Sequence, residues 1–192
     1  MAFLNGKMFI AASNPTLDAG GVNVFPAVDA VTFDGARVVL TPVLMGNGRA
    51  TDTMSGKAVT LNEVDPDSLS IDATGRLVLV NQAGSELVFI ANPGTRSQTV
   101  SRTLVGTQLE DTVWIKPAPG GRLLVVDGKT NTIYSVKTKF TLGTIYTETP
   151  DDSGVSGFVG SVDPATGNIK PVVIGFGKAT GLVFVPGGDG DE

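Results

Sequence analysis

The sequence predicts an all-β protein of the β-propeller class, and three observations support that prediction. First, 25 Gly and 11 Pro are spread over 192 residues that also contain many Val, Ile and Thr, which is typical of short strands joined by tight turns. Second, one pattern of strand, turn and strand recurs along the chain. Third, the two ends of the chain resemble the separated halves of that pattern, which is how propellers close.

The repeat is a short strand, a turn that contains Gly, and a second strand. It occurs twice in full, and the two glycines that begin the second strands are 46 residues apart. Four-stranded propeller blades repeat every ~40–50 residues, so the spacing fits one blade. A third copy is divided between the two ends of the chain. The copies comprise residues 67–71 with 75–80, 111–115 with 121–126, and 180–186 with 6–12.

The first blade is expected to contain strands at 6–13, 21–33 and 36–45. The dipeptide Asp34-Gly35 separates the last two of these strands, and it accepts the positive φ angles that hairpin turns require. No strand of this blade precedes residue 6 in the prediction. The first blade therefore lacks its innermost strand.

The remaining strands are expected to form two complete blades and to leave one strand over. The second blade covers residues 67–106 and the third covers 111–174, so the prediction totals twelve strands, or three four-stranded blades. The expected strands are near 68–71, 76–81, 86–91 and 99–105 in the second blade, near 112–116, 122–127, 131–137 and 169–174 in the third, and near 181–186 for the strand left over.

Three blades cannot close a ring, because propellers have ~4–8 blades around their channel. Open sheet edges at both ends would pair with other chains or aggregate. We therefore expect a two-fold homodimer in which residues 181–185 of each chain pair beside residues 6–12 of the other. The result would be a six-bladed ring in which strands are exchanged between two copies.

Residues 1–188 are expected to form a single half-propeller domain, followed by a solvated acidic tail at 189–192. Two insertions lengthen the repeat, at 45–57 and at about 138–160. Long loops often carry function, so each insertion could be a binding loop. A surface excursion or a subunit contact is the favoured interpretation of both.

The composition excludes several classes of function. A net charge of −5 disfavours nucleic acid as a partner, and no apolar run approaches the ~20 residues of a membrane-spanning helix. The chain has no Cys and no His, so it cannot build disulfides, thiol nucleophiles, thiolate or imidazole zinc sites, or a Ser-His-Asp triad. The first residues lack a signal peptide, which predicts a cytoplasmic protein as given, or a secreted or periplasmic one if a leader was removed.

Segments 65–68, 75–81, 131–136 and 181–186 resemble six-bladed propellers of the NHL-repeat and regucalcin/gluconolactonase-like superfamily. The resemblance extends over residues 6–186, and it lies in the blade pattern and not in an active-site signature. It is closest to uncharacterised bacterial members, of which this chain is similar to the second half. A gene fragment, a natural short form and an engineered half-propeller would all have such a sequence.

Acidic residues mark the starts of the expected inner strands. Asp67, Asp111 and Thr180 occupy equivalent positions there, with Asp65 and Glu110 beside them. Propellers bind ligands where their inner strands meet at the central channel, and a site with only oxygen ligands suits Ca²⁺ or Mg²⁺, with no organic cofactor. The resemblance implies a cation that polarises a lactone or phosphoester oxygen. The expected function is a metal-dependent hydrolase of lactones, esters or phosphotriesters, with Asp67 and Asp111 as candidate catalytic residues.

Other interpretations of these residues stay open. Asp before Ser or Thr at the start of a strand commonly caps a turn, and this role is favoured for Asp67 and Asp111. The metal set of the superfamily is not matched cleanly, because the first blade has Ala12 where the others have Asn81 and Asp127. The alternative functions are a non-catalytic propeller that binds a small ligand or a protein, and a self-assembling fragment without a native ligand.

The metal hypothesis makes a prediction about stability. Millimolar Ca²⁺ should raise the melting temperature, because a ligand that binds only the native state stabilises it. Replacement of both Asp67 and Asp111 by Asn should reduce that rise, as measured by differential scanning fluorimetry with Mg²⁺ and Ca²⁺ in parallel. If neither cation changed the melting temperature, the proposed metal site would be contradicted.

Overall fold

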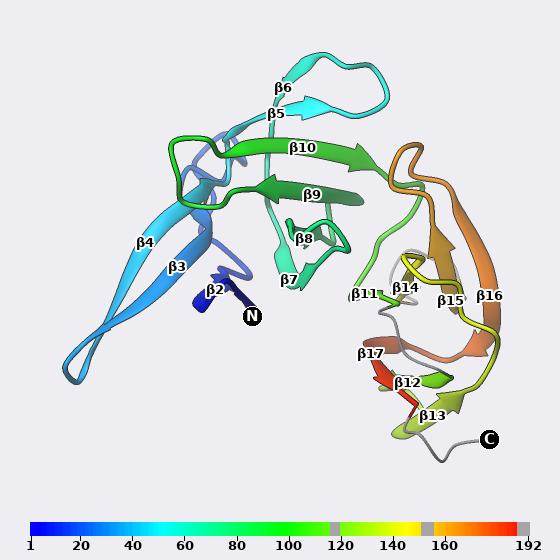
Figure 1. The fold of residues 1–192 in the computed structure, drawn as a ribbon. Coiled ribbons are helices and arrows are strands. Elements are labelled where there is room, and N and C mark those ends of the chain that lie inside the picture. The colour runs from blue at the N-terminus through cyan, green and yellow to red at the C-terminus, as the bar shows by residue number, and fades with distance from the viewer. Residues whose placement is uncertain (116–119, 151–155, 188–192) are drawn as a thin grey trace. The chain divides into compact units, whose positions relative to one another are not determined.

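The computed structural model describes residues 1–115, 120–150 and 156–187, which form seventeen β-strands and no helix (Figure 1). The chain divides into two compact units, Met1–Leu104 and Val105–Glu192. Each unit contains two β-sheets, and each is described separately below.

The first sheet of unit 1 is an antiparallel meander of four strands. The β1–β2 connection consists of Asn5 and Gly6, which have φ angles of 50° and 75°. Asn-Gly with two positive φ angles is typical of the two-residue hairpin turn whose twist matches that of the strands. The strands, in their order across the sheet, are β1 (Ala2–Leu4), β2 (Lys7–Ala11), β3 (Pro26–Asp34) and β4 (Arg37–Met45).

The second sheet of unit 1 contains a four-stranded meander and an added hairpin. Every residue of β8 is buried, and β9 is buried except for its last residue, so the middle of this sheet supplies much of the core. The strands of the meander are β7 (Pro66–Ile71), β8 (Leu77–Asn81), β9 (Glu86–Ala91) and β10 (Thr99–Leu104). The added hairpin consists of β5 (Arg49–Asp52) and β6 (Ala58–Thr60), and it joins the meander through a parallel pair between β5 and β10.

Unit 2 has two sheets as well, and the strand pairs in both are antiparallel. One has the order β11-β14-β15-β16 and the other has the order β13-β12-β17. The strands of the first are β11 (Thr112–Trp114), β14 (Ile145–Thr149), β15 (Gly157–Val162) and β16 (Ile169–Phe176), and those of the second are β12 (Gly121–Asp127), β13 (Thr132–Val136) and β17 (Ala179–Pro186).

Each unit contains a cluster of buried hydrophobic residues. In unit 1 the core joins the two sheets, with Phe9 and Val28 from the first packed in one cluster with Leu79 and Val88 from the second. In unit 2 the corresponding cluster includes Leu123, Val125, Tyr146, Val159, Phe176 and Leu182. The alternation of buried and exposed residues along β12 is that of a strand with one face on such a core.

These observations confirm the prediction of an all-β chain built from the blade-like antiparallel sheets of a β-propeller. The predicted number of blades is wrong, because the described residues form four sheets and not three four-stranded blades. Twelve strands were expected, and β1, β5, β6, β14 and β15 were missed.

The predicted exchange of strands between two copies is also wrong. β17 pairs along its length with β12 of the same chain, from Gly121 opposite Pro186 to Asp127 opposite Ala179. The edge of β2 that was expected to receive residues 181–185 of a second copy pairs with β1 of the same chain. The sequence signal that was overlooked is the Asn5-Gly6 turn, which folds the first residues back onto β2. A six-bladed ring completed in this way is therefore not the structure of this chain.

The third predicted blade, 111–174, combined strands that belong to different sheets. β11 pairs with β14 and not with β12. In the β7–β8 hairpin the Asp72 carboxylate organises the turn by accepting N–H bonds from Thr74 and Arg76, at 2.8 and 2.9 Å. The segment between β11 and β12 has no such aspartate and contains two prolines instead. The insertion expected at 138–160 supplies strands, since β14 and the start of β15 fall within it.

Candidate functional site

The four predicted metal ligands are divided equally between the two units. Asp65 and Asp67 lie at the start of β7 in unit 1, and Glu110 and Asp111 precede β11 in unit 2. All four are half-buried. Among the residues that the structure describes, no group of three or more acidic side chains is arranged to hold a metal ion.

The contacts of Asp111 are those of a backbone cap. Its carboxylate accepts an N–H bond from Leu182 in β17 at 3.2 Å, and its carbonyl oxygen accepts a bond from the Thr147 hydroxyl in β14 at 2.8 Å. Asp67 and Glu110 also have interaction partners. Burial raises the pKa of Asp65, whose N–H donates to Asn81. Asp111 therefore connects strands of both sheets of unit 2, as the capping interpretation requires.

Asn81 and Asp127, which occupy equivalent positions in the repeat, both bind backbone groups at strand ends. Both are fully buried. The Asp127 carboxylate accepts N–H bonds from Gly177 and Lys178, just before β17, at 2.8 and 2.9 Å. These and further N–H donors in its own turn lower the pKa of Asp127 to about 2. The turn-forming interpretation of both residues is confirmed.

Unit 1 contains a buried pair of carboxyl groups that the sequence analysis missed. Glu63, between β6 and β7, is 0% exposed, and Glu86, the first residue of β9, is 3% exposed. Glu86 accepts a bond from the Asn81 amide at 2.9 Å and pairs with the Arg102 guanidinium at 3.2 Å. Neither carboxyl oxygen of Glu63 has a hydrogen-bond partner of normal geometry among the described residues.

Burial, followed by the neighbouring Glu86 carboxylate, raises the pKa of Glu63 to about 9. Glu63 is therefore protonated at neutral pH, while Glu86 contacts the Arg102 guanidinium. A raised carboxyl pKa beside a second carboxylate is a common property of catalytic sites. Here both groups are enclosed in the interior of unit 1, so we assign the pair to the packing of the fold.

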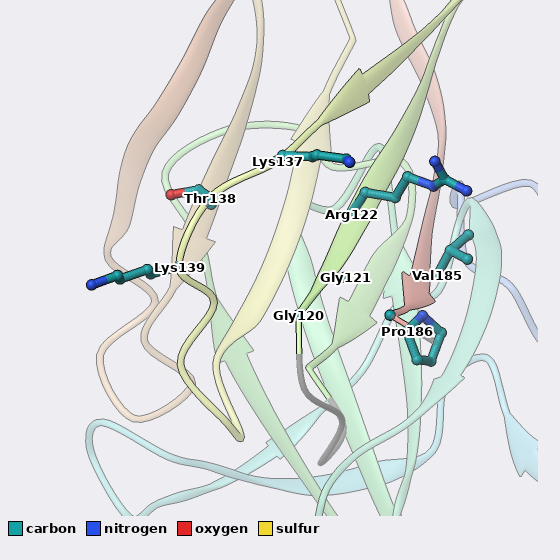
Figure 2. A pocket seen from close by; sticks show the side chains of 9 residues that line it. Gly120, Gly121, Arg122, Lys137, Thr138, Lys139, Val185 and Pro186 are labelled. Atoms are coloured by element: carbon teal, nitrogen blue, oxygen red, sulfur yellow. The ribbon is translucent and has the colours of Figure 1, made fainter. Parts of the chain in front are cut away.

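Unit 2 contains an open pocket of about 410 Å³ at one end of the β13-β12-β17 sheet (Figure 2). Its lining follows the register of the sheet. Arg122 lies opposite Val185 of β17. Leu123 lies opposite Val136, the last residue of β13, so Arg122 and Lys137 are the next residues along the chain on the two sides of this pair. The lining residues are Gly120, Gly121, Arg122, Lys137, Thr138, Lys139, Val185, Pro186 and Gly187.

The pocket is cationic. Figure 2 shows Lys137 extending towards Arg122, whose side chain runs on towards Val185, while Lys139 points away to the other side. The lining residues that the structure describes include no Asp or Glu. The ion pairs found among the described residues involve Arg76 and Arg102 of unit 1, so neither Arg122 nor Lys137 is neutralised by a described acid.

Aromatic packing holds the walls of the pocket in place. Phe140, which follows Lys139, makes edge-to-face contacts with Phe184 of β17 and Tyr146 of β14, at ring-centroid distances of 5.4 and 5.6 Å. Gly121 has a φ angle of 133°, and a Cβ atom there would lie 2.6 Å from the Phe184 ring. Position 121 therefore requires glycine, and the aromatic cluster packs against β17 beside it.

The sequence analysis did not find this pocket, because its residues come from three separate segments of the chain. The signal available was the run Lys137-Thr138-Lys139, which the prediction divides between the end of a strand at 131–137 and the start of an insertion at about 138–160. The like charge of Arg122 lies fifteen residues before Lys137 in the sequence. Only the β12–β13 register shows that these two residues lie near each other.

Comparison of the chain with models of protein families, with curated proteins and with solved structures finds no match. The described residues include no helix that is long and apolar enough to cross a membrane. What the protein binds must therefore be inferred from its own residues.

The buried Glu63 makes a prediction about pH. Its pKa is about 9 in the folded state and near 4.5 in the unfolded state, so the folded state binds more protons between these values. The free energy of unfolding should therefore fall as pH rises from about 5 to about 9, by at most about 1.4 kcal/mol per pH unit. In Glu63→Gln this fall should be smaller, because the amide does not ionise.

The measurement is urea denaturation from pH 5 to pH 9. Asp34→Asn, at the exposed turn between β3 and β4, is the matched control and should behave like the parent protein. If Glu63→Gln and the parent protein lost stability equally with rising pH, Glu63 would not be the protonated group.

Proposed function

We propose that this chain is a non-catalytic β-propeller-type protein that binds a small anionic ligand in the pocket of unit 2. The observation that carries the proposal is the placement of Arg122, in β12, and Lys137, just after β13, in the lining of one pocket, with no acid among the described lining residues. Like charges that lie close together repel each other. An anion bound between them would convert that repulsion into two attractive contacts.

The shape of the pocket supports a ligand larger than a single ion. Its volume of about 410 Å³ lies within the ~300–1,000 Å³ of small-molecule sites. Gly120 and Gly121 have no side chains to fill the space beside Arg122. The Arg122 guanidinium offers a planar set of N–H donors that suits carboxylate or phosphate oxygens, and Lys137 adds a second positive charge.

A second proposal follows from the resemblance to regucalcin- and gluconolactonase-like propellers. It is a Ca²⁺-dependent hydrolase with Asp65, Asp67, Glu110 and Asp111 as the metal ligands. The anion site is the stronger proposal, because the register of one sheet brings its residues together. Self-association is a separate proposal, and it would need a surface other than the paired edges of β2 and β12.

The binding proposal predicts a charge-dependent affinity. Phosphate, sulfate and citrate, measured separately by isothermal titration calorimetry at low ionic strength, should include at least one ligand of the chain. Arg122→Gln and Lys137→Gln should each weaken its binding by about tenfold, because each removes a charge-assisted contact.

Two substitutions outside the pocket are matched controls for the loss of one positive charge. Arg37→Gln in β4 and Lys7→Gln in β2 alter exposed residues of unit 1 and should leave the affinity within about twofold of the parent value, because neither residue lines the pocket. Absence of binding by all three anions, or equal losses in pocket and control variants, would contradict the proposal.

A further inference from the structure

We infer that the ligand of the unit 2 pocket is a phosphate monoester with an apolar group, such as an aryl phosphate; this inference rests on the proposed anion-binding function. Three properties of the pocket carry it: the number of its positive charges, the apolar residues beside them, and the volume left by its glycines.

The charge of the pocket fits a dianion. Arg122 and Lys137 together contribute two positive charges to one pocket, and no acid among its described lining residues offsets them. A phosphate monoester carries a charge of about −1.5 to −2 at pH 7, because its second pKa is ≈ 6. A carboxylate or a sulfate ester carries a single negative charge and would leave one of the two cations without a counter-charge.

The apolar group is indicated by the residues next to Arg122. Val185 lies directly opposite Arg122 across the β12–β17 pair, so their side chains are on the same face of the sheet. Val185 is half-buried and the neighbouring Pro186 is exposed. Figure 2 shows Val185 near the end of the Arg122 side chain and Pro186 further from it, at the end of β17. A ligand whose phosphate meets Arg122 and Lys137 can therefore cover apolar surface with the rest of its structure.

The volume of the pocket distinguishes an ester from the inorganic ion. A pocket of about 410 Å³ is of the size that small organic ligands occupy. An added Cβ at Gly121 would lie 2.6 Å from the Phe184 ring, so this lining position requires glycine. Inorganic phosphate would fill the charged end and leave the surface of Val185 and Pro186 in contact with water.

The test is calorimetric titration with inorganic phosphate, phenyl phosphate, phenyl sulfate and phenol. Phenyl phosphate should bind about tenfold more tightly than inorganic phosphate, since burying its ring removes apolar surface from water. Phenol should not bind measurably. The affinity for phenyl phosphate should rise several-fold between pH 5 and pH 7.5, while that for phenyl sulfate, which does not titrate there, should stay constant.

A variant of β17 separates the apolar contact from the charged one. Val185→Thr should remove most of the preference for phenyl phosphate over inorganic phosphate while leaving the affinity for inorganic phosphate unchanged. Val183→Thr, at a more exposed position of the same strand, is the matched control and should retain the preference. Melting temperatures of both variants are measured to verify that they are folded.

The outcomes distinguish this inference from the function on which it rests. If inorganic phosphate binds but phenyl phosphate binds no more tightly, the inference of an ester ligand is contradicted, and the proposed anion-binding function stands. If phenyl sulfate binds as tightly as phenyl phosphate at pH 7.5, the preference for a dianion is overturned. If none of the anions binds, both the ester and the proposed function are overturned.

Discussion

The register of β12 between β13 and β17 is the constraint on which unit 2 and its pocket depend. Leu123 and Val125 face the core, and this fixes Arg122 on the opposite face, with Val185 on one side and Lys137 on the other. A shift by one residue would turn every side chain of the strand to the other face. The burial of two aliphatic side chains therefore places the charged residues of the pocket.

Two buried polar residues hold the ends of the inner strands in both units. Asp127 binds the backbone just before β17, and Asn81 binds the backbone just before β7. In a buried setting an unpaired N–H is costly, so a side-chain oxygen at these positions satisfies groups that the ladder leaves open. The repeat in the sequence thus reflects a shared structural requirement of β8 and β12.

Most strands could be predicted from the sequence, but their partners could not. The alternation and turn signals around β4, β9 and β16 are local, so the strands themselves were found. Pairing depends on distant residues. Segments 67–71 and 111–115 have similar sequences, yet the first pairs with the next strand, β8, through a turn that Asp72 organises, and the second pairs with β14.

For the candidate sites too, single residues could be found from the sequence, but pairs formed by distant segments could not. The acidic residues at the starts of strands were visible in the sequence, and Asp111 proved to bind backbone groups. The Glu63 and Glu86 pair and the Arg122 and Lys137 pair were invisible, because each forms only when separate segments meet. Charge runs in the sequence do not indicate which cations will face each other across two strands.

A double-mutant cycle in anion-free buffer tests most directly whether Arg122 and Lys137 oppose each other. The account predicts that Arg122→Gln and Lys137→Gln each raise the free energy of unfolding, by about 0.2–1 kcal/mol, and that the double variant is no more stable than the better single one. Changes that simply add would show that the two cations do not interact, and would contradict the pocket as described.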